Sequence, residues 1–251
     1  MFEEPSPKDS IIVRLDPRIK IVAVFFFSIA VAVLNRIPVL LCALMLAFLI
    51  VLTAKVSIKE LIKRLTPVNM LVGFLWLFLP FTFAGKPIFY IGSLPVTHEG
   101  VLYATRISIR SNAIMFMMIV LVATTSIFTL GHAMHALKIP KKIVHLFFFT
   151  YRYIHVMQRE YIRLVNSMKI RGFRAKTNLH TYKTFAYMIG MILIRSFDRA
   201  QRVHNAMLCR GFKGNLYSLK TFSIKKRDMA SLVLALAVII MLGVLEWKKT
   251  I

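Results

Sequence analysis

The sequence contains only two cysteines, and this scarcity excludes a disulfide framework. Cys42 lies in an apolar stretch and Cys209 in a basic one, which does not suggest a thiolate metal site. His132 and His135 have helical spacing, but no further candidate ligand lies nearby in the sequence. We interpret them as interfacial histidines and expect no metal site and no cofactor in this chain.

The sequence also lacks the Gly-x-x-x-x-Gly-Lys-Ser/Thr loop that cradles nucleotide phosphates. The Gly85-Lys86 pair has no upstream glycine at the required spacing. A membrane enzyme would need a nucleophile, a base or a metal cluster, and no such combination is present. We therefore expect a chain without catalytic residues that does not hydrolyse ATP by itself.

Acidic residues are scarce: 10 Asp and Glu stand against 34 Lys and Arg, for a net charge of +24. Of the basic residues, 20 fall between Lys138 and Arg227, where Glu160 and Asp198 are the only acids. They alternate with apolar residues and match no nucleic-acid-binding motif. We expect no nucleic-acid partner, because membrane topology accounts better for the charge.

The hydrophobic content, 58% with a mean hydropathy of +0.68, is that of a membrane protein. Five apolar stretches contain no Asp, Glu, Lys or Arg: residues 21–34, 39–54, 68–84, 111–130 and 229–245. Ion-coupled transporters need ionisable groups inside the membrane, so this chain alone is a poor candidate for one. The pattern predicts an all-α integral membrane protein with about five transmembrane helices.

The charge distribution predicts the topology. If the basic block lies in the cytoplasm, the chain divides into four segments of a multi-pass plasma-membrane protein. These are a cytoplasmic N-terminal segment (residues 1–20), a four-helix transmembrane region (residues 21–130), a cytoplasmic coupling-helix region (residues 131–228) and a C-terminal transmembrane helix (residues 229–251). The first 20 residues are polar and do not resemble a secretory signal.

Local signals place several element ends. Asp16 and Pro17 predict a helix start. Residues 57–65 suggest a brief interfacial helix, after which Pro67 would open the third span. Residues 85–100 show little periodicity and suggest a loop.

Two long amphipathic helices are expected in the basic region, one from Lys141 to a first glycine stop and one from about Thr181 to a second. Arginines interrupt both, so we interpret them as partly embedded helices rather than spans. A peripheral helix pair lying on anionic lipid remains an alternative.

A duplicated segment marks the two stops. Residues 163–174 recur as residues 202–213, with Arg, Asn, Met, Arg-Gly and Phe at matching positions. In each copy Gly suits the left-handed position after a helix cap, and Phe can fold back on the Met before it. Both helices thus end in an arginine, which predicts a two-part docking surface; two ordinary capped helices remain the alternative.

Four segments resemble the transmembrane coupling (T) subunit of energy-coupling factor transporters, with the cobalt and nickel type as the nearest branch. They are Met-Lys-Ile-Arg-Gly-Phe at 168–173, Ala-Met-Leu-Cys-Arg-Gly-Phe-Lys-Gly at 206–214, Ile-Arg-Ser-Phe-Asp-Arg-Ala at 194–200 and Leu-Asp-Pro-Arg-Ile-Lys at 15–20. The family motif often has Ala before Arg, where this chain has Ile170 and Cys209.

The resemblance implies two coupling helices, each ending in an x-Arg-Gly motif that docks into one of two ABC-type ATPase subunits. The implied docking residues are Met168, Ile170, Arg171, Gly172, Phe173, Met207, Cys209, Arg210, Gly211 and Phe212. The ATPase subunits would bind ATP and Mg²⁺. A separate membrane subunit would capture the cobalt or nickel ion, and the remaining partner is the lipid bilayer.

The same motifs would fit a T subunit that serves vitamin-binding partners. A membrane scaffold without a transport role is the alternative from another functional class.

Overall fold

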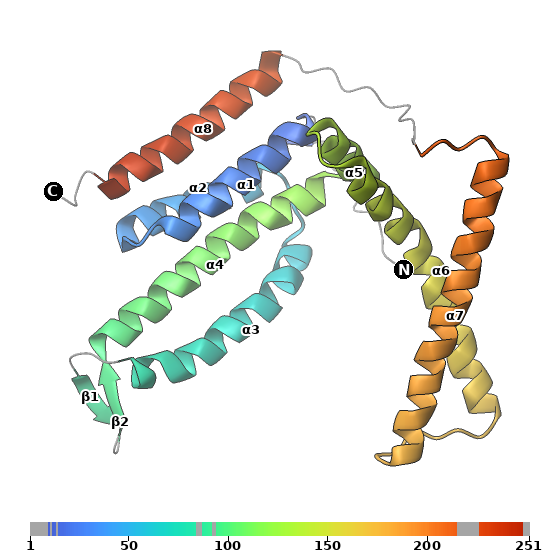
Figure 1. Cartoon of the computed structure of the whole chain (residues 1–251). Helices are drawn as coiled ribbons and strands as arrows, with labels where there is room; N and C mark the ends of the chain where they lie inside the picture. The colour runs from blue at the N-terminus through green and yellow to red at the C-terminus, as the bar shows by residue number, and fades with distance from the viewer. Residues whose placement is uncertain are drawn as a thin grey trace. The chain divides into compact units, whose positions relative to one another are not determined.

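The structure is a computed structural model that describes residues 10, 12–13, 15–83, 87–91, 94–214 and 226–247. It divides into two units, residues 1–133 with 222–251, and residues 134–221. The described elements are mostly α-helices, as Figure 1 shows, so the all-α class is confirmed. The division falls within the short helix α5 (Ile127–Ala136).

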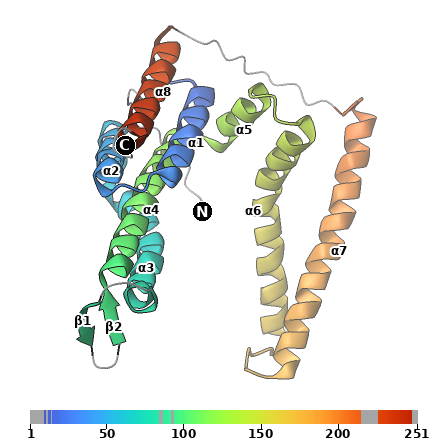
Figure 2. The same cartoon turned by 60° about the vertical axis from the view of Figure 1, so that its left-hand side comes forward.

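In the first unit, α4 (His98–Thr124) is the central helix. It packs against α1 (Pro17–Val33), α2 (Ile37–Thr53) and α3 (Ile58–Thr82). The last helix, α8 (Lys226–Trp247), returns to pack on α1 and α2 (Figures 1 and 2). Segments from both ends of the chain therefore build one bundle.

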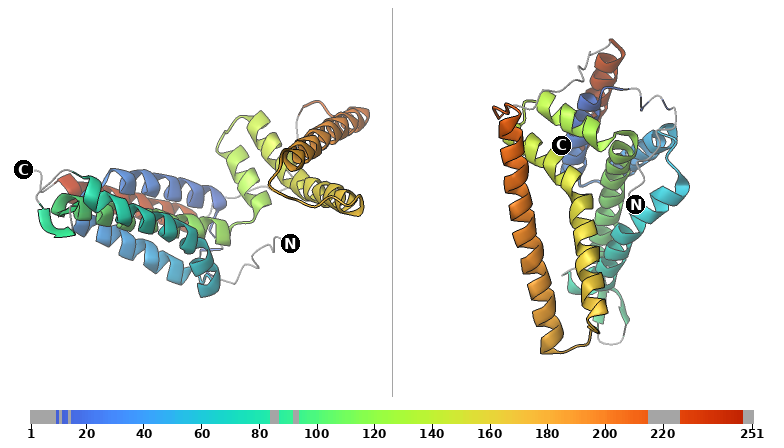
Figure 3. Two further views of the ribbon diagram at one scale, coloured as in Figure 1. Left: turned by 90° about the horizontal axis from the view of Figure 1, so that it is seen from below. Right: turned by 90° about the vertical axis from the view of Figure 1, so that its right-hand side faces the viewer.

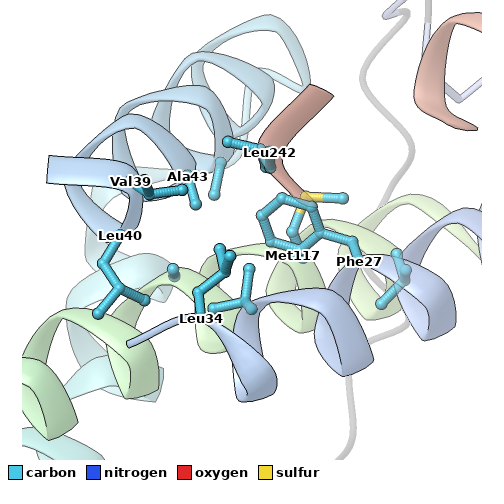
Figure 4. Close-up of a cluster of buried hydrophobic side chains, with 11 residues drawn as sticks. Phe27, Leu34, Val39, Leu40, Ala43, Met117 and Leu242 are labelled. Carbon is cyan, nitrogen blue, oxygen red and sulfur yellow. The ribbon is translucent and has the colours of Figure 1, made fainter. Parts of the chain in front are cut away.

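The core of this bundle is apolar and joins four helices, as Figure 4 shows. Its buried residues are Val24, Phe27, Val31, Leu34, Val39, Leu40, Ala43, Ala47, Ala113, Met117 and Leu242. Ala43 and Ala47 lie one turn apart on α2 and belong to the same cluster as Ala113 of α4. Small residues at such a seam let two helix backbones approach closely, which is how membrane helices gain packing energy.

The start of α1 was predicted correctly. Asp16 is the N-cap and accepts a hydrogen bond from the backbone N–H of Arg18, with Pro17 at the first helical position. The backbone N–H of Asp16 also donates to Oδ1 of Asp228 on α8 (3.2 Å). Lys20 donates from Nζ to the carbonyl oxygen of Thr124 on α4 (3.2 Å). These buried polar contacts hold one end of the bundle together, because breaking one would leave a buried polar group without a hydrogen bond and lower the stability of the fold.

The prediction of a separate helix at residues 57–65 was wrong, since α3 runs unbroken through Pro67. Proline removes one backbone donor, but membrane helices tolerate it where neighbouring groups and small local adjustments compensate. The apolar stretch begins at residue 68, so hydrophobicity identifies only the part of α3 that follows Pro67.

The expected loop at 85–100 and the fourth span at 111–130 were also misplaced. Strands β1 (Pro87–Ile91) and β2 (Leu94–Thr97) form an antiparallel hairpin, and α4 already begins at His98. Thr97 caps α4 by accepting from the N–H of Gly100. The chain leaves the helix at Thr125, which has an extended backbone, and α5 follows.

Three of the described helices are long and apolar enough to cross a membrane: Ile58–Thr82, His98–Thr124 and Asp228–Trp247. The helix Ile37–Thr53 is also apolar but shorter. The two long helices of the second unit do not meet the same criterion of length and composition. The number of spans, five in the sequence-based interpretation, stays a prediction.

Polar side chains link α3 to α4 within their apolar surroundings. Asn112 donates from Nδ2 to Oδ1 of Asn69 (2.9 Å), and the Trp76 indole N–H donates to Oγ of Ser108 (2.8 Å). Such interhelical bonds in membrane proteins are worth roughly 0.6 to 2 kcal/mol. We expect Asn112→Ala to lower the free energy of unfolding by about that amount in an SDS titration.

The matched control for this prediction is Thr82→Ala. Thr82 donates only to the carbonyl of Phe78 in its own helix, at 3.0 Å, so its loss should change stability less. Equal losses in both variants would show that the Asn69–Asn112 bond contributes nothing specific to helix pairing.

Candidate functional site

The second unit contains two long helices, α6 (Lys141–Ile170) and α7 (Leu179–Cys209). They run antiparallel, as Figures 2 and 3 show, and residues 171–178 join them. Asn178 caps α7: its Oδ1 accepts from the N–H of Thr181 (3.0 Å). The Thr181 hydroxyl in turn accepts from the N–H of Lys176 (3.1 Å), which holds the connection against the start of α7.

Both helices end in the same backbone motif, as the duplicated sequence predicted. Gly172 has φ +78° and its N–H donates to the Lys169 carbonyl (3.0 Å), while the N–H of Phe173 donates to the Met168 carbonyl (3.1 Å). This pair of bonds is a Schellman motif.

The second copy repeats it bond for bond. Gly211 also has φ +78° and bonds to Leu208 (2.9 Å), and Phe212 bonds to Met207 (3.0 Å). The left-handed backbone favours glycine, so each Arg-Gly pair fixes where its helix stops and leaves the arginine as the capping residue.

The side chains of the two motifs divide into exposed and half-buried groups. Ile170, Arg171, Gly172, Cys209, Arg210 and Gly211 are exposed, and Met168, Phe173, Met207 and Phe212 are half-buried. Ile170 is 87% exposed, an unusual position for a large aliphatic side chain. Each tip therefore presents a cation together with apolar surface, which is the composition of a protein-binding hot spot.

The aromatic residues support the two tips differently. The Phe173 ring packs edge-on against Phe185 of α7, with centroids 5.9 Å apart. Phe212 instead lines a cavity between the two helices, together with Met207. In both copies the backbone N–H of Phe bonds back to the Met carbonyl, while the two rings differ in their surroundings. The expected contact between the Phe and Met side chains stays a prediction.

The two arginines lie at opposite ends of the helix pair. The helices are bridged between Glu160 and Arg195, about three turns before Arg171 on α6 and about four turns before Arg210 on α7. Since the helices are antiparallel and rise about 1.5 Å per residue, the tips are separated by roughly 40 Å. This separation leaves room for a separate partner at each tip.

Glu160 is the buried charged residue among the described residues of this unit. It is 5% exposed and accepts a hydrogen bond from the guanidinium of Arg195. Arg163 lies 3.6 Å away on the same helix, and Arg199 of α7 lies 4.0 Å away. Three cations surrounding one carboxylate leave the cluster with a net positive charge.

The hydrogen bond from Arg195 lowers the pKa of the Glu160 carboxyl, and the nearby charges of Arg163 and Arg199 act in the same direction. A carboxyl with a lowered pKa in the folded state stabilises that state above its unfolded pKa, near 4.5. That contribution is lost as the pH falls through the lowered pKa, so the Glu160 carboxylate remains charged at neutral pH.

A cavity of about 1040 Å³ opens between α6 and α7 on one side of this ion pair. Its walls are mainly apolar and include Phe149, Tyr153, Met157, Phe197, Val203 and Met207. The space shows that the helices separate beyond the ion pair, towards the end of α7.

Sequence reasoning missed Glu160 as part of the site and noted it only among the few acids of the basic region. The available signal was that it is the only carboxylate in α6. The described residues contain no group of three or more His, Cys, Asp or Glu that could hold a metal ion.

The model of a family described as cobalt transport protein (CbiQ) matches residues 8–221. Curated relatives named energy-coupling factor transporter transmembrane protein EcfT are 28% identical in Listeria innocua, 27% in Staphylococcus aureus and 25% in Bacillus subtilis. These alignments cover 97%, 96% and 83% of this chain and 96%, 95% and 83% of the respective relatives.

Proposed function

This chain belongs to the cobalt transport protein (CbiQ) family and is a transmembrane (T) subunit of an energy-coupling factor transporter, and from that premise we propose that it couples ATP hydrolysis in partner subunits to cobalt uptake. The chain itself would be non-catalytic. The observation that carries the proposal is the pair of identically capped Arg-Gly ends at opposite ends of one helix pair.

The geometry suits two ATPase partners. Arg171 and Arg210 are both exposed and both follow the last turn of a long helix, where the helix dipole favours a cation. Each would pair with a carboxylate in a groove of one ATPase subunit. Met168 and Phe173 at one tip, and Met207 and Phe212 at the other, would supply apolar contact around the charge.

The mechanism follows from the separation of the tips. ATP binding would draw the two ATPase subunits together and so change the distance between Arg171 and Arg210. Because α6 and α7 are stiff rods about 45 Å long, a displacement at their ends changes the angle between them. That change would be transmitted to the membrane helices and to a substrate-capture subunit in the plasma membrane, with the α6–α7 unit on the cytoplasmic side.

Cobalt is proposed as the cargo on two grounds: the description of the matching family and the sequence resemblance of residues 194–214 to the cobalt and nickel branch. The metal ion is a substrate, and its ligands would belong to the capture subunit. ATP and Mg²⁺ would be bound by the ATPase subunits.

The test is purification of the affinity-tagged chain from membranes of its own host, with identification of the co-purifying proteins. The complex is then reconstituted into liposomes, and accumulation of cobalt, nickel and a panel of vitamins is measured with and without ATP. We expect two ATPase subunits or a homodimer, a membrane capture subunit and ATP-dependent cobalt uptake.

Other outcomes are equally decisive. Vitamin uptake without cobalt uptake would replace the proposed cargo by the vitamin alternative. Nickel uptake in preference to cobalt would change the ion but keep the coupling role. Purification without any ATPase would contradict the coupling role and favour a scaffold.

A further inference from the structure

Glu160 occupies a singular position in the second unit. It is the only acidic residue among the 30 residues of α6, it is buried, and it faces cations from both helices. A buried carboxylate without a neighbouring cation would strongly destabilise the folded chain, and the surrounding arginines prevent that loss of stability. Arg195 and Arg199 come from α7 and hold the two helices to each other at this point.

Little else is buried between these helices. The buried residues of α6 are Val144 and Glu160, and those of α7 are Thr181 and Met188. Thr181 and Met188 both belong to the first third of α7, near the connection, and the large cavity lies beyond the ion pair. Glu160–Arg195 is thus the described inter-helix bridge closest to the middle of the pair.

We propose that the Glu160–Arg195 bridge is the pivot of the two coupling helices, a pair of positioning residues that converts tip displacement into a change of helix angle. The inference rests on the proposed coupling function and assigns a role to residues outside the docking motifs.

The physical reason is mechanical. If two rods touch only through apolar contacts near one end, a force that draws their far ends together can be absorbed when one rod slides along the other. A bridge that joins the two helices at a point between their tips prevents one helix from sliding along the other. The same force then changes the angle between the helices. An arginine and a carboxylate suit this purpose because the planar guanidinium fixes direction as well as distance.

The neighbouring arginines offer a matched pair of variants. Arg195→Gln removes a cation that reaches Glu160 from the other helix. Arg163→Gln removes a cation that reaches the same carboxylate from within α6, at 3.6 Å, and its side chain is 75% exposed. Both variants lower the charge by one, but only the first removes a link between the helices.

The experiment uses the intact transporter complex in liposomes and measures three quantities: the ATPase subunits recovered with the chain, ATP hydrolysis and ATP-dependent uptake. For Arg195→Gln we expect normal subunit recovery and hydrolysis but uptake reduced about tenfold, within the range by which residues between two sites alter coupling. For Arg163→Gln we expect uptake within about twofold of the parent. Arg195→Lys should restore part of the uptake, because it returns the charge without the planar fork.

A distance measurement separates pivoting from general destabilisation. Spin-labelled non-natural amino acids placed at Ser167 and Asn205, both exposed, report the separation of the two helix ends and leave Cys42 and the docking residue Cys209 in place. In the parent complex the distance should shift between the nucleotide-free and ATP-bound states. In Arg195→Gln the distribution should be broad in both states and shift little.

Several results would overturn the pivot. One is equal uptake by Arg195→Gln and Arg163→Gln; another is loss of uptake in strict proportion to loss of assembled complex. A normal distance shift in Arg195→Gln would have the same meaning. Failure of the coupling function itself is recognised separately, because the parent chain would then recover no ATPase and show no ATP-dependent uptake.

Discussion

Combined replacement of Arg171 and Arg210 by glutamate is expected to abolish recovery of the ATPase subunits while the chain remains in the membrane. Both side chains are exposed at helix ends, so folding of the chain should not depend on them. Removing a charge that pairs at a desolvated interface costs roughly 2 to 5 kcal/mol, or about 30- to 5000-fold in affinity. Reversal adds repulsion, and the two sites act together in one assembly. Affinity purification from detergent-solubilised membranes, with the ATPases quantified by mass spectrometry, is the measurement.

The matched control is Arg174→Glu combined with Lys213→Glu. These cations are exposed and close to the motifs, but each lies beyond the glycine that ends its helix. The net charge change is the same, so a purely electrostatic attraction between the basic unit and acidic partners would be weakened equally. Stoichiometric recovery of ATPases by the Arg171 and Arg210 variant would defeat the docking assignment.

The separation of the tips gives this prediction a further consequence. At roughly 40 Å apart, Arg171 and Arg210 cannot compensate for each other at one groove. A single reversal should therefore leave one contact intact and weaken recovery, whereas the double reversal removes both. If either single variant had the full effect, the two motifs would have to serve the same partner surface.

The helix ends could be predicted from the sequence because they depend on local chemistry. A Schellman motif needs a residue that accepts φ near +78°, and the duplicated Arg-Gly-Phe predicts both positions without any knowledge of tertiary packing. The N-cap at Asp16 is similarly local. In each case the deciding atoms lie within about six residues of one another.

The errors occurred where distant contacts decide. Pro67 predicts a helix boundary, although α3 continues through it. The hairpin at β1 and β2 depends on pairing across a turn and contains Pro87 and Pro95, so neither strand showed a regular alternation. The role of Glu160 depends on Arg195, which lies 35 residues later in the sequence and beside Glu160 in the fold. The sequence does not show which residues of α6 face which residues of α7, so it could not predict this pair.

Alanine in place of both Gly172 and Gly211 is expected to weaken ATPase recovery even though every docking side chain remains. Both glycines have φ +78°, where an L residue costs about 1 to 2 kcal/mol. If the strained backbone is required for docking, the loss is about 5- to 30-fold per site. If the chain relaxes instead, the helix continues or frays and Arg171 and Arg210 point elsewhere. The measurement is again the amount of ATPase that co-purifies, at matched amounts of the chain in the membrane.

Two other glycines supply the controls for this prediction. Gly214 has φ +82° and open space around it, so Gly214→Ala imposes the same strain just outside the second motif. Gly190 lies inside α7 without a positive φ and also has open space, so Gly190→Ala should stabilise the helix by about 0.5 to 1 kcal/mol. Neither should reduce recovery. If Gly214→Ala were as damaging as the motif variants, backbone strain anywhere near the end of α7 would explain the loss. If all variants bound normally, the direction in which the capped helix ends hold their arginines would be irrelevant, and the duplicated Arg-Gly-Phe segment would be no more than two ordinary helix stops.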